Sequence, residues 1–363
     1  MSIFCDNDEI PIVKDEYKSF LHKTTILYGS SNTGKSVLIK HIMFLLKDII
    51  PNLIIFNPTN DLNNTYTGIV PELTIYREVD PDILISIYER QREAVEIFNL
   101  VNKLTKLKEI FDLCANQQEK DMYLRITKIT NDVKNSYEYK NIHMAKKKSD
   151  ITSIDQIQKE KHIELFKTVI KKKYNNNNLQ NDNTLTDEQK KVIKYIDFNP
   201  EFLLVADDCA SNAKEWGSLP QVNELFFNGR HFHITTIISL QDEQILPPKI
   251  RSNAFNSIFT TKQCASAYFS RGTNNFPVKD RKLYCKFLDC IFHDNEWTTN
   301  GDEIKNYKKI VYSRDDENHK IKYIIANLYD NFKFGSEYLF KLSEKTKDTD
   351  RRKVTTKFSK LFQ

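Results

Sequence analysis

The chain has 363 residues and a mass of 42.8 kDa, enough for one large domain or for a core domain that carries a sizeable insertion. Its hydrophobic fraction of 40% argues against disorder, whereas 28% charged residues and a mean hydropathy of -0.55 argue against a membrane protein. The net charge of +5 is uneven, because residues 140–173 hold ten lysines against four acidic residues and residues 341–360 hold eight basic against three acidic ones. Such basic segments suit contact with a polyanion, although solvated lysine-rich helices give the same pattern.

Targeting and redox features are weak in this sequence. No apolar run approaches the roughly 18 residues that a membrane span needs, and the start MSIFCDNDEI lacks the pattern of a secretory signal, so we expect a protein inside the cell. Six thinly spread cysteines predict reduced thiols and not a disulfide scaffold. Cys285 and Cys290, with His293 nearby, have no second pair at zinc spacing, and we interpret both as buried thiols.

The first predicted elements are a strand, a glycine-bearing loop and a helix. TTILY at 24–28 is short and β-branched, GSSNTGKS at 29–36 follows at once, and residues 37–50 then show helical periodicity until Pro51 ends it. LIIF at 53–56 predicts a second buried strand, and ELTIY at 72–76 a short edge strand.

The pattern becomes helical from Asp82 to about Tyr174. Apolar residues between positions 84 and 111 recur every three or four residues, which predicts a helical stripe that packs on the main domain. The asparagine-rich run at 175–183 predicts a flexible loop. We therefore predict a helical, lysine-rich insertion over 82–197.

Strand patterns return at 202–208, 233–241 and 257–261, and alternation with helices or loops predicts an α/β fold with a parallel sheet. Residues 309–313 and 321–329 flank a polar turn and predict a carboxyl-terminal hairpin at the sheet edge. The predicted organisation is a core in two parts, 1–81 and 198–340, interrupted by the insertion and followed by a basic tail at 341–363.

GSSNTGKS matches the phosphate-binding pattern GxxxxGK[ST] in full. Its glycines allow backbone N–H groups to turn towards a phosphate chain, Lys35 can reach the outer phosphates, and the Ser36 hydroxyl can bind magnesium. The dipole of the following helix adds to the attraction. We predict that ATP is bound by Gly29, Ser30, Ser31, Asn32, Thr33, Gly34, Lys35, Ser36 and Val37.

An acidic pair follows the strand at 202–206. Because ligands of a parallel sheet bind at the carboxyl ends of its strands, Asp207 is expected to hold Mg²⁺ and Asp208 to act as general base on the attacking water. Many such motors have Glu at the second position, so the shorter Asp208 is a departure from the usual pattern. The alternative is two solvated acids that end a strand.

Gln241 ends an otherwise apolar strand and is predicted to contact the γ-phosphate or the attacking water. Arg230 precedes the same strand and is the first candidate for an arginine finger that acts on a neighbouring subunit's nucleotide, with Arg251 as the second. Neither an NKxD motif for guanine nor an LSGGQ motif is present, which argues against GTPases and ABC ATPases.

These motifs together resemble a known family. GSSNTGKS, FNPTNDLNNTYTGIVP, YERQREA, LLVADDCA, GRHFHITTIISLQ and KIVYSRDDEN look like those of the DNA-packaging ATPases of nucleocytoplasmic large DNA viruses, a branch of the FtsK/HerA-type translocases. The resemblance implies a RecA-like P-loop NTPase core with strand order 5-1-4-3-2 and a ring-shaped homo-oligomer that drives double-stranded DNA into a capsid. It also assigns catalysis to Lys35, Asp208, Gln241 and Arg230, and magnesium binding to Ser36 and Asp207.

The expected protein is a magnesium-dependent ATPase motor whose partners are double-stranded DNA of any sequence, further copies of itself and capsid or procapsid proteins. The expected location is the host cell cytoplasm at sites of virus assembly, with association with the virion left open. Basic clusters at 146–148, 171–173 and 351–353 are the candidate DNA contacts. Two alternatives are a weakly hydrolysing ATP-binding scaffold of capsid assembly and a P-loop nucleoside kinase.

Overall fold

The computed structural model describes residues 2–5, 8–140, 148–174, 184–209, 216–242, 244–274, 278–292, 296–299, 302–305, 308–314, 316 and 320–345. The asparagine-rich run at 175–183, the basic residues 146, 147 and 351–353, and His293 lie outside these ranges. The chain divides into two compact units, a core unit of residues 1–92 and 201–363 and an insertion unit of residues 93–200. Among the described helices, none combines the length and apolar character needed to cross a membrane.

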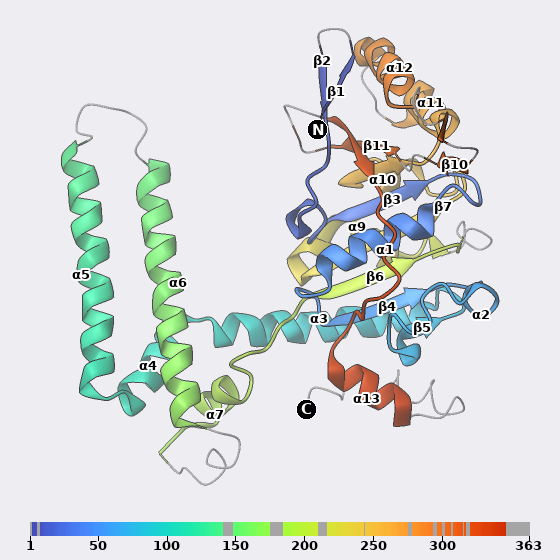
Figure 1. The fold of residues 1–363 in the computed structure, drawn as a ribbon. Coiled ribbons are helices and arrows are strands. Elements are labelled where there is room, and N and C mark those ends of the chain that lie inside the picture. The colour runs from blue at the N-terminus through green and yellow to red at the C-terminus, as the bar shows by residue number, and fades with distance from the viewer. Residues whose placement is uncertain are drawn as a thin grey trace. The chain divides into compact units, whose positions relative to one another are not determined.

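An eight-stranded sheet forms the centre of the core unit (Figure 1). Its strands lie in the order β12-β11-β8-β3-β7-β6-β4-β5, and all neighbours from β8 to β5 are parallel. β11 pairs antiparallel with both β8 and β12. The predicted α/β fold with a mostly parallel sheet is therefore confirmed. The strands are β3 (Thr24–Tyr28), β4 (Asn52–Phe56), β5 (Ile75–Tyr76), β6 (Phe202–Ala206), β7 (Ile234–Leu240), β8 (Asn256–Phe259), β11 (Lys308–Ser313) and β12 (Ile321–Ile325).

Every residue of β3, β4, β6, β7 and β8 is buried. This explains their continuous apolar or β-branched runs, since a parallel sheet is covered on both faces. Successive side chains point to opposite faces, so Ile26 and Tyr28 of β3 belong to one hydrophobic cluster and Leu27 between them belongs to another. The sheet thus separates two hydrophobic cores.

Helices cover both faces of the sheet. Leu38 and Ile42 of α1 (Lys35–Leu46) join the cluster of Leu27, and Figure 1 shows α1 crossing that face. The cluster of Ile26 and Tyr28 receives side chains from α9 (Pro220–Asn228), α11 (Lys262–Ser270), α12 (Val278–Phe292) and the start of α3 (Pro81–Val101). The shorter elements are η1 (Tyr17–Ser19), α2 (Asn60–Asn63), η2 (Glu72–Thr74), η4 (Gly229–Phe232), α10 (Pro248–Arg251), η5 (Gly272–Asn274) and α13 (Glu337–Lys345).

Two small hairpins, β1 (Ser2–Cys5) with β2 (Asp8–Pro11) and β9 (Glu296–Thr299) with β10 (Asp302–Lys305), were not predicted. The first brings Cys5 to α12, where it forms a disulfide with Cys290 across a Cα–Cα distance of 5.9 Å. The expectation of reduced, buried thiols is therefore wrong for Cys290, and it is wrong for Cys285 in another way because that thiol is exposed. A separation of 285 residues hides such a pair from any local spacing rule.

The insertion unit is helical. It contains α4 (Leu104–Cys114), α5 (Gln117–Lys140), α6 (Lys148–Lys173) and α7 (Asp187–Lys194). The apolar stripe over 84–111 does not pack on a single core: Leu84 and Ile87 join the core-unit cluster, whereas Leu107 and Phe111 join a separate cluster with Phe166 of α6. Periodicity predicted a helical stripe but could not show that its two ends pack in different hydrophobic clusters.

Candidate nucleotide-binding site

The predicted phosphate-binding loop connects the end of β3 to the start of α1. A Cβ atom at Gly29 would lie 1.8 Å from Thr260 Oγ1 and 2.8 Å from Thr33 Oγ1, so only glycine fits against β8 at this point. Gly34 has a φ of 80° and precedes α1 in the left-handed region. Gly29 is therefore required by the lack of space beside the threonine side chains and Gly34 by its left-handed backbone, which agrees with their fixed places in the motif.

Lys35 is buried at the first position of α1. Its Nζ donates to the carbonyl oxygens of Gly29 at 2.7 Å and Ser30 at 2.8 Å. Burial lowers the pKa of Lys35 below its ordinary value, while the carboxylates of Asp207 and Asp208 oppose that shift. The loop thus wraps around the ammonium group, whose present acceptors are the loop's own carbonyls.

Asp207 lies directly after β6 and is buried and hydrogen-bonded on both oxygens. Its Oδ2 accepts from Ser36 Oγ at 2.9 Å and from the Tyr66 hydroxyl at 2.8 Å, and its Oδ1 accepts from Ser239 Oγ at 2.5 Å. Burial and the neighbouring Asp207 raise the pKa of Tyr66 well above its ordinary value, so Tyr66 stays a donor. Both predicted magnesium ligands, Ser36 and Asp207, are therefore in direct contact.

Asp208 adopts a φ of 59°, a left-handed conformation that turns the chain sharply after the strand. Its carboxylate lies 3.2 Å from Thr59 Oγ1, whose single proton is shared with Asn57 Oδ1 at 3.0 Å, and it accepts from Gln241 Nε2 in a longer contact of 3.4 Å. Thr59 is itself oriented by Asn57, whose Oδ1 accepts from the Thr59 backbone N–H at 2.9 Å. Two polar side chains, one from the turn after β4 and one from directly after β7, thus contact the carboxylate that is predicted to be the base.

The parallel sheet explains why these residues meet. β7 lies between β3 and β6, with Leu240 in register with Tyr28, and the Gly29 N–H donates to Leu240 O at 3.1 Å. The carboxyl ends of the three strands therefore form one edge, which brings together the loop, the acidic pair and Gln241.

Several contacts at this edge come from residues to which the sequence gave no role. Asn57, Thr59 and Tyr66 lie in the segment FNPTNDLNNTYTGIVP, which carried part of the family resemblance without any assigned function. Ser239 lies in the buried strand β7, which also holds Thr235 and Thr236, so its hydroxyl gave no distinct signal in the sequence.

The two arginine candidates lie elsewhere. Arg230 is exposed in η4, which precedes β7 and thus lies at the amino edge of the sheet, opposite the phosphate-binding loop. Its guanidinium lies over the ring of Phe255 at 6.0 Å. Arg251 is only 4% exposed in α10, and a side chain buried to that extent is unsuited to reach another subunit.

The residues present suit a magnesium nucleotide. Serine and aspartate oxygens are ligands that Mg²⁺ prefers, and the two predicted ligands already share a hydrogen bond. The space that a Cβ at Gly29 would fill is taken by neighbouring hydroxyls, so the loop keeps the close backbone path that phosphate binding requires.

The sheet, the loop and the polar edge together define a P-loop NTPase. No protein-family model matches the sequence. Protein B354L of African swine fever virus (isolate Tick/Malawi/Lil 20-1/1983) is 32% identical over 349 residues, which cover 92% of this chain and 90% of B354L. The chain belongs to the family of B354L, and the assignment of its motifs to a family of large DNA viruses is confirmed.

Other similarities are weaker. Protein 015R of Frog virus 3 is 22% identical over 298 residues, covering 80% of this chain and 62% of 015R. Among solved structures, the genome packaging NTPase B204 of Sulfolobus turreted icosahedral virus 2 matches 86% of this chain and 98% of B204 with 12% identity and a TM-score of 0.33. The plasmid coupling protein TrwB matches 92% of both chains with 11% identity and a TM-score of 0.37. At these TM-scores the structural likeness supports no assignment of function.

Proposed function

We propose that this protein is an ATPase motor that moves double-stranded DNA into the capsid during viral genome packaging. The observation that carries the proposal is the convergence of Lys35, Ser36, Asp207, Asp208 and Gln241 at one edge of a parallel sheet. A nucleoside kinase has no evident use for a glutamine that contacts the second acid of the pair. Membership of a viral family supports the viral role.

The residues take the following roles in hydrolysis. Ser36 and Asp207 would hold Mg²⁺, which neutralises charge on the β- and γ-phosphates when it is bound. Lys35 exchanges its two carbonyl acceptors for phosphate oxygens, which releases the loop from the ammonium group. Asp208 accepts a proton from the attacking water, and Thr59 and Gln241 hold its carboxylate in the orientation needed for that step.

The position of Arg230 supports a ring of several subunits. It is exposed at the edge opposite its own phosphate-binding loop, so any nucleotide that it stabilises belongs to another copy of the chain. The proposed partners are accordingly further copies of the protein, duplex DNA held by its phosphates, and capsid or procapsid proteins at assembly sites in the host cytoplasm.

The deciding measurement is ATP hydrolysis with and without duplex DNA of several sequences. We expect DNA to stimulate turnover strongly and without sequence preference, and Lys35→Ala to abolish both basal and stimulated rates. Hydrolysis that DNA leaves unchanged would favour the scaffold alternative. Transfer of phosphate to a nucleoside would favour the kinase and overturn the proposal.

A further inference from the structure

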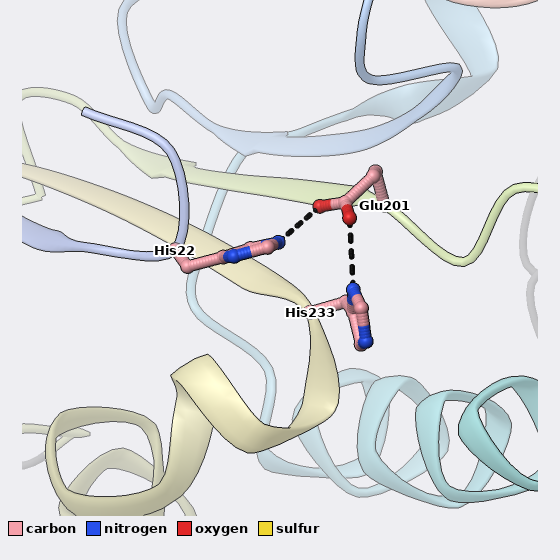
Figure 2. A group of neighbouring side chains, drawn as sticks. All are labelled: His22, Glu201 and His233. Carbon is pink, nitrogen blue, oxygen red and sulfur yellow. Dashed lines mark hydrogen bonds and ion pairs between the residues drawn. The ribbon is translucent and has the colours of Figure 1, made fainter. Parts of the chain in front are cut away.

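A second polar cluster lies at the amino edge of the sheet, away from the nucleotide site. His22, Glu201 and His233 lie close before β3, β6 and β7, which are adjacent strands of the sheet. Figure 2 shows the three side chains pointing towards one another, with one contact from the Glu201 carboxylate to each imidazole ring. All three residues belong to the core unit. The parallel strands thus bring together residues that are distant in the sequence. His22 and Thr235, which are hydrogen-bonded beside the cluster, are 213 positions apart.

The cluster has close contacts. His22 Nε2 lies 2.6 Å from Glu201 Oε2, and His233 Nδ1 lies 2.8 Å from Glu201 Oε1. The imidazole rings meet edge to face, with centroids 5.0 Å apart. Burial by itself raises the pKa of Glu201, but hydrogen bonds from the two histidines keep that pKa below its ordinary value. Both carboxylate oxygens thus already face an imidazole nitrogen, as the oxygens of a ligand to a shared ion would.

The backbone holds both imidazoles in place. His22 has a φ of 59° and His233 a φ of 56°, and non-glycine residues adopt this left-handed region uncommonly. The His22 N–H donates to Thr235 Oγ1 at 2.9 Å, and the His233 carbonyl accepts from the Phe202 N–H at 3.1 Å. Bonds to the neighbouring strands therefore fix the direction of each histidine before any ligand arrives.

The ligand atoms are near the spacing that a metal requires. One donor atom from each residue lies within 4.8 Å of the others. Nitrogen and oxygen ligands about 2.0–2.1 Å from zinc lie about 3.3 Å apart in a tetrahedron. The two histidine–glutamate contacts, at 2.6 and 2.8 Å, therefore need to lengthen by about 0.7 and 0.5 Å, the two imidazoles must close to the same spacing, and the ion replaces the proton in each contact. The side chains are 34%, 13% and 22% exposed for His22, Glu201 and His233, which leaves a path for an ion from solvent.

We propose that His22, His233 and Glu201 bind one divalent cation of the zinc class and that this ion joins the beginnings of β3, β6 and β7. Two imidazoles and one carboxylate suit zinc and its neighbours, whereas magnesium prefers oxygen ligands. Three protein ligands leave a fourth position for water. The site is separate from the magnesium site of the proposed ATPase, because it lies at the opposite end of the same strands.

The test is a cobalt titration of the full chain after chelation, without nucleotide. We expect visible absorption bands typical of a low-coordinate cobalt site, saturating at about one ion per chain and removed by added zinc. His22→Asn and His233→Asn should weaken cobalt binding at least tenfold, since asparagine tolerates the left-handed backbone but supplies no imidazole. His231→Asn is the matched control, because His231 is exposed beside the cluster and outside it.

Thermal unfolding gives a second readout. Zinc should raise the melting temperature of the wild-type protein and of Ser36→Ala, but not of His22→Asn or Glu201→Gln, and magnesium alone should not reproduce the rise. Absence of cobalt uptake, or equal uptake by wild type and the two asparagine variants, would overturn the proposal. So would an intense near-ultraviolet thiolate band, which assigns the metal to a cysteine. Because no nucleotide is present, loss of ATPase activity cannot produce any of these results.

Discussion

The two edges of the central sheet use the same three strands for different chemistry. At the carboxyl ends of β3, β6 and β7 lie the proposed phosphate-binding loop, an acidic pair and a glutamine, whereas at the amino ends lie His22, Glu201 and His233. The residues of the carboxyl edge occur in short motifs, and those of the amino edge occur singly. Contacts shorter than 3 Å occur at both edges, so a recognisable sequence motif is not needed for a closely packed polar cluster.

The largest expected effect concerns Arg230, which lies at the amino edge of one subunit and is proposed to act on a nucleotide at the carboxyl edge of another. Arg230→Ala should lower ATP turnover by about 10³-fold if its guanidinium stabilises the transition state of a neighbouring subunit's nucleotide. Mixing this variant with inactive Asp208→Asn protein, which still offers Arg230, should restore part of the activity at concentrations that permit mixed rings. Lys249→Ala, which removes another exposed cation of the core unit, serves as the control. A monomer by light scattering, with activity per subunit independent of concentration, would contradict the idea.

At the carboxyl edge, Asp208→Asn should lower turnover by about 10²-fold and leave ATP binding intact, because the amide keeps the shape of the side chain but cannot accept the proton. Single-turnover hydrolysis and nucleotide binding measure the two properties separately. Asp242→Asn is the matched control, since Asp242 is an exposed acid one position after Gln241. Near wild-type hydrolysis by Asp208→Asn would mean that the base is another group.

Thr59→Val should reduce turnover about tenfold with little change in KM, because it removes the hydroxyl that donates to Asp208 while preserving the shape of the side chain. Thr59→Ser should recover most of the rate. The pH profile of turnover should also shift for the valine variant if Thr59 positions the base. A profile that stays unchanged would leave Thr59 with a structural role only.

Removal of the disulfide tests whether either edge depends on contacts made outside the central sheet. Cys5→Ser should destabilise the core unit by about 2–4 kcal/mol, yet leave ATP turnover at 25 °C unchanged, because the bond joins β1 to α12 away from the loop. Thermal unfolding with and without reductant measures the first effect. Cys285→Ser, which removes an exposed free thiol, should change neither property. Equal melting temperatures for Cys5→Ser and wild type would contradict the prediction.

The smallest expected effect concerns the insertion unit, from which no residue was assigned to either edge. Replacing Lys171, Lys172 and Lys173 by Gln should make the log-log salt slope of duplex binding shallower by about one unit for each lysine that contacts a phosphate. Lys171 and Lys172 already form ion pairs with Asp197 at 2.9 Å and Glu119 at 3.7 Å, so DNA must compete with these carboxylates. Lys128→Gln in α5 is the control. An unchanged slope would assign DNA binding to other segments.

The elements of the fold that could be predicted are those whose burial pattern can be recognised in a short stretch of sequence. Parallel strands covered on both faces must be apolar along their length, so β3, β4, β6, β7 and β8 could be recognised one by one. The amino-terminal hairpin β1–β2 was not predicted because four-residue strands have little periodicity to detect. The pairing of Cys5 with Cys290 was missed because spacing along the chain carries no information about a contact between distant elements.

The sequence by itself determined the α/β class, the phosphate-binding loop and the acidic pair, because each depends on neighbouring residues whose backbone and side chains act together. Only the tertiary structure decided that Tyr66 and Ser239 complete the hydrogen bonds of Asp207, that Thr59 reaches Asp208, and that two histidines share one glutamate. These contacts depend on which strands become neighbours in the sheet. That order follows from the packing of the whole core and not from any local segment of the chain.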